Sequence, residues 1–160
     1  MSFHRALSFC TVFLVASISP TPSKALDLPS GLFFGANLSE VQSTAQSQGW
    51  ELDQSTFSFN AWSVDTEGLT FHFCDQMLTS VDQILDGGLR AFIETVGIFT
   101  LKYGEPDTDA FILSPRSRLE THGMESIFEP GQGMTISVQI NSNDNKETVW
   151  TRKSDSSVCE

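Results

Sequence analysis

Residues 86–111, DGGLRAFIETVGIFTLKYGEPDTDAF, carry the clearest helical pattern in the chain. Apolar side chains recur there at helical spacing and predict one buried helix face over residues 89–103; they are Leu89, Phe92, Ile93, Val96 and Phe99. Gly104 stands where a helix-ending glycine belongs, and Pro106 prevents further helix. Residues 110–113 then predict a strand. The rest of the chain is interpreted from this order of helix, turn and strand.

A weaker copy of the same order lies upstream, over residues 38–59. Asn37 and Glu40 have the spacing of a capping box, and they predict a short helix that ends at Gly49. Phe57 and Phe59 then alternate with polar residues, which indicates a strand within residues 50–62. The repeated order suggests two helix-plus-three-strand repeats.

Alternation of apolar and polar residues predicts the remaining strands, at Leu69–Cys74, Met77–Leu85 and residues 124–128, 135–140 and 146–153. The short connections between them favour antiparallel pairing. The expected fold class is therefore α+β, a mostly antiparallel sheet with two helices on one face. Four phenylalanines are expected to fill the core between helices and sheet: Phe57, Phe59, Phe71 and Phe73.

The first 25 residues have the layout of a secretory signal peptide. Arg5 supplies positive charge before an apolar run, and Ser23 and Ala25 are the small residues expected before a cleavage site after Ala25. The apolar run is too short for the roughly 20 residues of a membrane-spanning helix. We therefore predict a secreted or periplasmic protein without a membrane span. It would consist of a signal peptide (1–25), a single α+β domain (26–153) and a flexible tail (154–160).

The chain is strongly acidic. It has 9 Lys and Arg against 20 Asp and Glu, a formal net charge of −11. Cleavage would remove Arg5 and Lys24, leaving 7 basic residues against 20 acidic ones and a net charge of −13. Nucleic-acid binding needs basic residues against the phosphates, so this charge argues against it. The charge serves solubility, or it attracts a cationic partner.

Two cysteines remain after the predicted cleavage, Cys74 and Cys159. An even number in an oxidising compartment suggests a disulfide, which would tie the C-terminal tail to the domain. The alternative is a half-buried Cys74 and a free Cys159 in a frayed tail.

No residue pattern predicts catalysis. His72 and Cys74 lie on one predicted strand face, where positions two apart are about 7 Å apart, too far for direct activation of the thiol. Exposure on a polar sheet face explains both residues equally well.

Metal binding also lacks support in the sequence. His122 stands in a loop with Glu120 and Glu125, but without the spacing of a known metal motif. Asp107 and Asp109 are too sparse for a calcium loop. We therefore expect no catalytic residue, no cofactor and no metal.

The predicted binding face is the side of the sheet away from the helices. Alternation does not assign all three tryptophans to the core, and an exposed tryptophan is a frequent anchor of protein contacts. The positions expected on this face are Trp62, Thr70, His72 and Gln139. The leading function is non-enzymatic binding of another protein. The alternative is binding of a small molecule or envelope ligand in a pocket between helices and sheet.

Two stretches resemble a known group of proteins. The capped helix with Leu38-Ser39-Glu40-Val41 and the turn Gly104-Glu105-Pro106-Asp107 are similar to those of small secreted bacterial α+β domains. These are of the β-lactamase-inhibitor-protein and outer-membrane assembly lipoprotein type. The resemblance implies a protein-binding role without enzymatic activity. This sequence departs from the group in lacking the lipidated cysteine of the lipoprotein and the two disulfides of the inhibitor.

Overall fold

The computed structural model describes residues 26–56, 58–113, 121–143 and 146–159. The predicted signal peptide, Phe57 and Glu120 lie outside these ranges. None of the helices in the described part of the chain has the length and apolar character needed to cross a membrane.

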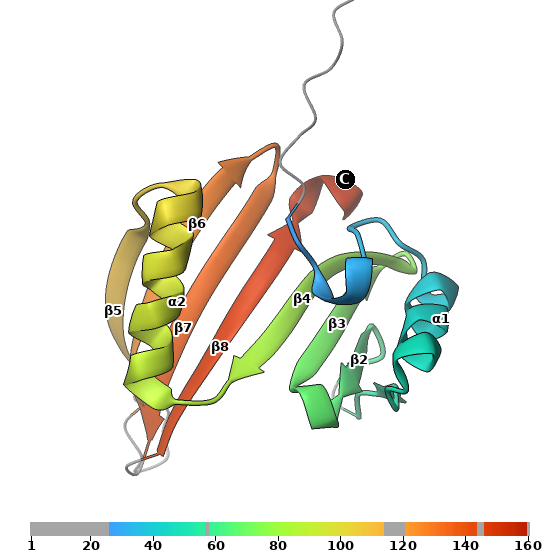
Figure 1. The fold of residues 1–160 in the computed structure, drawn as a ribbon, viewed down its shortest axis with the longest axis horizontal. Helices are drawn as coiled ribbons and strands as arrows, with labels where there is room; N and C mark the ends of the chain where they lie inside the picture. The colour runs from blue at the N-terminus through green and yellow to red at the C-terminus, as the bar shows by residue number, and fades with distance from the viewer. Residues whose placement is uncertain (1–25, 57, 114–120, 144–145, 160) are drawn as a thin grey trace, which may run out of the picture.

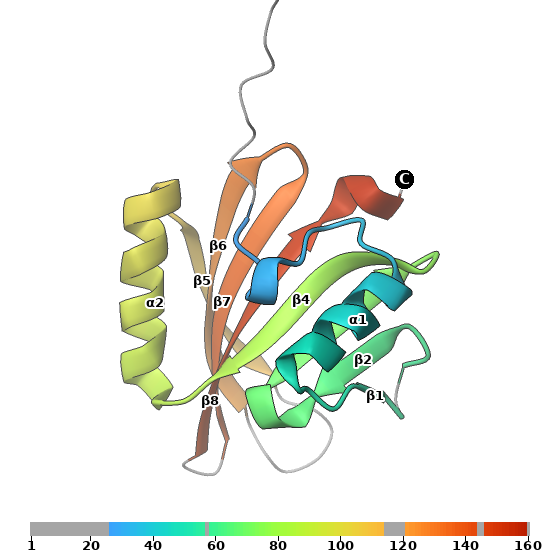
Figure 2. The same cartoon turned by 45° about the vertical axis from the view of Figure 1, so that its right-hand side comes forward.

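In the described residues, a single antiparallel sheet of eight strands forms the centre, in the order β1-β2-β3-β4-β8-β7-β6-β5 (Figure 1). The strands are β1 (Asp53–Gln54), β2 (Ala61–Val64), β3 (Leu69–Cys74), β4 (Met77–Leu85), β5 (Asp107–Leu113), β6 (Thr121–Gly131), β7 (Met134–Asn143) and β8 (Lys146–Asp155). The helices α1 (Leu38–Gln48) and α2 (Gly88–Tyr103) lie on the same side of this twisted sheet (Figures 1 and 2). The predicted α+β class is confirmed.

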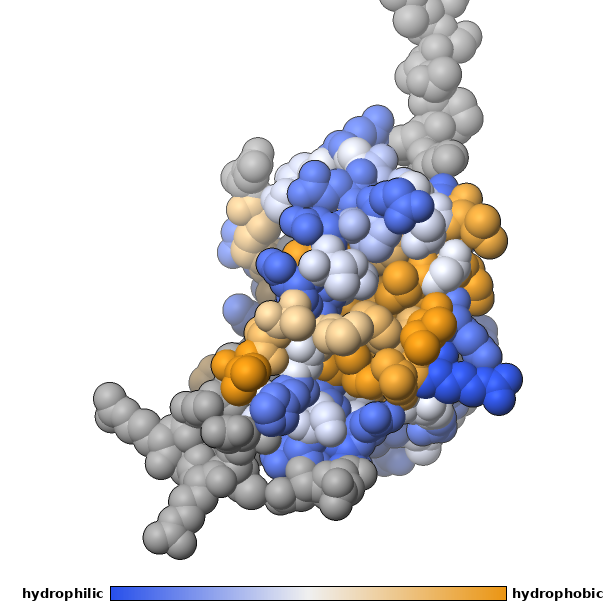
Figure 3. All heavy atoms as spheres, turned by 90° about the vertical axis from the view of Figure 1, so that its left-hand side faces the viewer, coloured by the Kyte–Doolittle hydropathy of each residue, from blue (hydrophilic) through white to orange (hydrophobic). Residues whose placement is uncertain are grey.

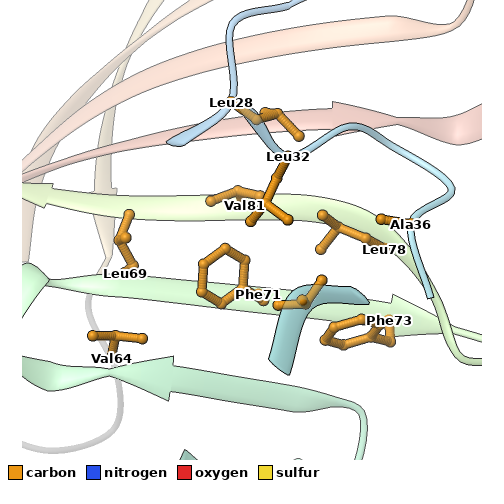
Figure 4. Close-up of a cluster of buried hydrophobic side chains, with 10 residues drawn as sticks. Leu28, Leu32, Ala36, Val64, Leu69, Phe71, Phe73, Leu78 and Val81 are labelled. Atoms are coloured by element: carbon orange, nitrogen blue, oxygen red, sulfur yellow. The ribbon is translucent and has the colours of Figure 1, made fainter. Parts of the chain in front are cut away.

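Two apolar clusters fill the space between helices and sheet. The first lies beneath α1 and includes Val41 of that helix. Phe71 and Leu78 belong to its sheet side (Figure 4). The second lies beneath α2 and joins Phe92 to Phe128 and neighbouring residues of β7 and β8. The N-terminal segment crosses both clusters, since it buries Leu26 in the second and Leu28, Leu32 and Ala36 in the first.

Helix α1 begins and ends as its sequence predicts. The Asn37 side chain accepts a hydrogen bond from the Glu40 amide at 3.1 Å, and the Glu40 carboxylate accepts one from the Asn37 amide at 2.8 Å. Together these bonds form the expected capping box. Gly49 then ends the helix in the left-handed conformation, at φ 72°.

Helix α2 is rotated from the predicted orientation. It buries Phe92 and packs Val96, Phe99 and Tyr103 against the second cluster, whereas Leu89 and Ile93 of the predicted stripe are exposed. The Phe99 ring meets Phe128 edge-on, with ring centroids 5.8 Å apart. The apolar stripe is broader than the surface that the sheet offers, so the helix buries its aromatic side.

The predicted strand at residues 50–62 is wrong over most of its length. Only the two-residue β1 and the short β2 form there, and Phe59 is 91% exposed in the turn between them. The Ala61 amide donates to Ser58 O at 3.2 Å, which closes a turn where the strand was expected. Phe59 therefore lies in this turn and not in a strand of the described sheet.

The predicted flexible tail is also corrected. Strand β8 continues through Asp155, and Ser156–Cys159 forms a 3₁₀ helix. The Ser156 amide donates to Gly133 O at 3.1 Å. A disulfide joins Cys159 to Cys74, with their Cα atoms 6.0 Å apart. The folded domain thus extends to residue 159.

Candidate functional site

The sheet face opposite α1 and α2 is here called the uncovered face (Figure 2). Residues directly opposite each other in an antiparallel sheet point to the same side. The strand registers therefore bring separate parts of the chain into two parallel rows on this face. The rows are Thr70, Asp82, Arg152 and Ser137, and Ile84, Trp150, Gln139 and Glu125.

Asp82 lies at the centre of the first row and binds two neighbours. The Arg152 Nε and Nη2 atoms each donate to its carboxylate at 2.7 Å, and His72 Nε2 lies 2.9 Å from Asp82 Oδ2. Burial raises the pKa of Asp82, but the hydrogen bonds from Arg152 and His72 outweigh it and hold the pKa below its ordinary value. The same ion pair raises the pKa of Arg152. This network joins β3, β4 and β8.

Trp150 and Ile84 lie directly opposite each other in the second row. Trp150 is 36% exposed, and Ile84 is also exposed. Beside Trp150 is a hollow of about 90 Å³, whose wall includes Gln139, Glu125 and Arg152. A water molecule takes about 30 Å³ in the liquid, so the hollow has room for the end of one side chain. It is too small for a typical cofactor.

Three of the four predicted positions lie on this face. Thr70 and His72 are on β3, and Gln139 lines the hollow. Trp62 does not lie there, because its partner in the register is the buried Phe71, so both point toward the helices. It packs half-buried against the first cluster.

Trp150 is the exposed tryptophan that the sequence interpretation missed. The strand pattern of β8 contains the signal, because Val149 and Thr151 are buried and the residue between them must face the other side.

Neither the thiol nor the metal candidates form a site in the described ranges. Cys74 is in the disulfide and carries no free thiol. His122 pairs with Ile112 on the helix side of the sheet, away from Glu125. No group of three or more His, Cys, Asp or Glu side chains is placed to hold a metal within the part of the chain that is described.

No protein-family model, curated protein or solved structure matches this chain. The surfaces of the molecule therefore carry the functional argument. A hollow of about 330 Å³ lies next to the N-terminal segment, between Phe33, Phe34 and Met134. Its size is within the range expected for the alternative function, although it lies beside the N-terminal segment and not beneath a helix.

Proposed function

We propose that this protein is a secreted or periplasmic, non-enzymatic domain that binds another protein through the uncovered face. The observation that carries this proposal is the exposed pair Trp150 and Ile84 next to the Asp82–Arg152 ion pair. Tryptophan and arginine are enriched among residues that dominate binding energies. A polar surround with an apolar centre is typical of protein interfaces.

The charges of the face indicate the kind of partner. Asp82 neutralises Arg152, whereas the Glu125 side chain forms no hydrogen bond with the described residues and interacts with Arg152 through charge alone. Since the chain has a net charge of −11, the face attracts a partner with positive charge.

The architecture supports a two-part interpretation of this domain. We infer two repeats, each a helix followed by strands: α1 with β1–β4, and α2 with β5–β8. The sheet order supports this inference, because the last strands of the two parts, β4 and β8, pair at the centre of the sheet. Each part has four strands and not the three predicted. Asp82 and Arg152 would then join the two parts. The resemblance to small secreted bacterial protein-binding domains is a further part of this proposal.

Secretion is proposed from the first 25 residues of the sequence. Leu26, the residue after the expected cleavage site, is buried in the second cluster. N-terminal sequencing of the exported protein is expected to give Leu26 first. A mature protein that begins elsewhere, or that remains in the cytoplasm, would contradict the localisation.

The binding proposal is tested with residues 26–160 immobilised and exposed to an extract of the cell envelope. We expect one protein to be captured reproducibly, and Trp150→Ala to reduce its affinity by about tenfold or more, as expected for a central aromatic. Glu125→Arg should weaken binding of the same partner, although it removes no apolar side chain. The matched control is Leu101→Ala, since Leu101 is 92% exposed on the solvent side of α2.

The control and the melting temperatures decide the outcome. If Leu101→Ala weakens capture as much as Trp150→Ala, or if no partner is captured reproducibly, the proposal is wrong. Equal melting temperatures of the variants exclude unfolding as the cause of lost binding.

A second candidate is binding of a small molecule or envelope ligand. The hollow beside Phe33 and Phe34 favours it, because about 330 Å³ is within the lower range of ligand pockets. A ligand that raises the melting temperature of the wild type but not of Phe34→Ser, in the absence of any captured protein, would select this candidate.

A further inference from the structure

Strand β5 is an open edge of the sheet. It has seven residues and, among the described strands, pairs only with β6, whereas β1 at the other edge has two residues. No described strand covers its outer side. A long edge strand offers backbone donors and acceptors to an added strand.

The helix-facing side of β5 carries exposed apolar residues. Helix α2 lies over β6, β7 and β8, so it leaves Ala110 and Ile112 of β5 exposed. Figure 3 shows the apolar surface on this side of the molecule. We call it the β5 groove and define it by Leu89, Ile93, Ile112, Met124 and Ile140. Ile112 is 66% and Ile93 60% exposed, and the hollow between Leu89, Met124 and Ile140 has about 190 Å³.

The other side of β5 is acidic. Asp107 and Asp109 point to the uncovered face, and Asp109 lies directly opposite Glu125 of β6. Like charges in this position destabilise a sheet. Arg152 is attracted to Glu125, but no Lys or Arg side chain of the described ranges forms an ion pair with Asp107 or Asp109. A cationic neighbour on the outer side of β5 would relieve the repulsion.

We propose that β5 binds an extended segment of another protein in which basic and apolar residues alternate. The segment adds a ninth strand to the eight of the sheet. Its Lys or Arg side chains lie beside Asp107 and Asp109, and its apolar side chains enter the β5 groove. Main-chain hydrogen bonds supply affinity, and the alternate side chains supply specificity.

A second copy of this chain fits the edge poorly. Each copy has a net charge of −11, and a pair of β5 strands would bring two sets of Asp107 and Asp109 to one face. The proposal goes beyond the function proposed above, because it uses the sheet edge and does not require Trp150.

The test uses a short peptide of alternating lysine and valine, with capped ends, added to residues 26–160. We expect slower hydrogen exchange at alternate backbone amides of β5 when the peptide binds. Asp109→Lys should weaken binding by about tenfold, a size typical of a lost close charge pair. Asp65→Lys is the matched control, since it makes the same change of charge at an exposed position after β2. A peptide of the same composition with its lysines and valines in separate blocks should bind weakly.

Several results would overturn the proposal. One is equal weakening by Asp65→Lys, which would indicate general charge attraction. Others are binding without protection of the β5 amides, and self-association that protects β5 without the peptide. Ile112→Ser tests the apolar contacts in the β5 groove and should also weaken binding of the peptide. Trp150→Ala should leave peptide binding to β5 unchanged. A failure of the β5 proposal can therefore be distinguished from a failure of the proposal that the uncovered face binds a protein.

Discussion

The Asp82 carboxylate contacts both Arg152 and His72 on the uncovered face. Arg152 binds both of its oxygens, and a bidentate pair of this kind is stronger than a single hydrogen bond. Because Arg152 is half exposed, water reduces the gain from the pair. The carboxylate nevertheless orients the arginine beside Trp150 and so shapes the hollow next to it.

We expect Asp82→Asn to lower the free energy of unfolding by about 1.5 kcal/mol at pH 7, the size expected for hydrogen bonds to charged groups that are partly exposed. The folded-state pKa of Asp82 lies below its ordinary value of 3.8. The stabilisation is therefore fully present above that value and is lost as the pH falls through the lowered pKa. Urea unfolding at pH 7 and in strong acid should show the difference between wild type and variant only at pH 7.

The control for Asp82 is Asp53→Asn, on the exposed strand β1. It should leave stability nearly unchanged at both pH values. An equal loss for Asp82→Asn in strong acid would show that the carboxylate charge is not responsible.

The residues of the uncovered face were predictable only where alternation within one strand decides which side of the sheet a residue faces. The pattern of β3 places Thr70 and His72 together, and both lie on the uncovered face. The contact of Asp82 with Arg152 spans 70 positions and depends on which strands pair. Trp62 was misplaced for the same reason, because its orientation follows from its register with Phe71.

Helix α2 depends on a residue from another element at its start. Its N-cap is Gly87, which has no side chain to cap the helix, and the Leu89 amide instead donates to Glu147 Oε2 at 2.8 Å. The acidic group also complements the positive end of the helix dipole. Gly88 has φ 54° and lies against Glu147, so a larger residue there would displace this cap.

Glu147→Ala should therefore lower the free energy of unfolding by about 1 kcal/mol, as typical for loss of an N-cap. Glu51→Ala, at an exposed glutamate before β1, is the control and should have little effect. Thermal unfolding followed by circular dichroism measures both. The cap would be dispensable if the two variants melted at the same temperature.

The sequence predicted where α2 lies in the chain but not how it is rotated. Its apolar residues cover more than one helix face, and only the packing of Phe92 and Phe99 on the sheet decides which face is buried. Leu89 and Ile93 therefore lie in the β5 groove and not in the core. Phe59 shows the same limit, since its alternation with polar residues could not reveal that it lies in an exposed turn and not in a strand.

At the scale of the whole molecule, the disulfide connects the end of the chain to β3. Cys74 and Cys159 are 85 positions apart. In the chain-entropy model, closing a loop of this size stabilises the folded state by about 4 kcal/mol. The number of cysteines suggested the pairing, with a half-buried Cys74 and a free Cys159 as the alternative, but the sequence did not predict the ordered segment around Cys159.

Cys74→Ser and Cys159→Ser should each lower the free energy of unfolding by about 2–4 kcal/mol. The double variant should lose no more than either single variant, because all three break one bond. Urea unfolding with and without reductant measures the effect. A wild-type protein that is insensitive to reductant, or that has two thiols open to alkylation before reduction, would contradict the disulfide.

The N-terminal segment that crosses both clusters also affects the order of folding. Lys153 Nζ donates to Asp27 O at 2.6 Å, a contact across 126 positions, and Leu26 packs on strands from the second half of the chain. Contacts between such distant residues form late and make folding slow. The first residues of the domain cannot complete their packing until β8 has been synthesised. We therefore expect a nascent chain to stay incompletely folded until its synthesis is nearly complete, which would keep it in a form that can be threaded through an export channel.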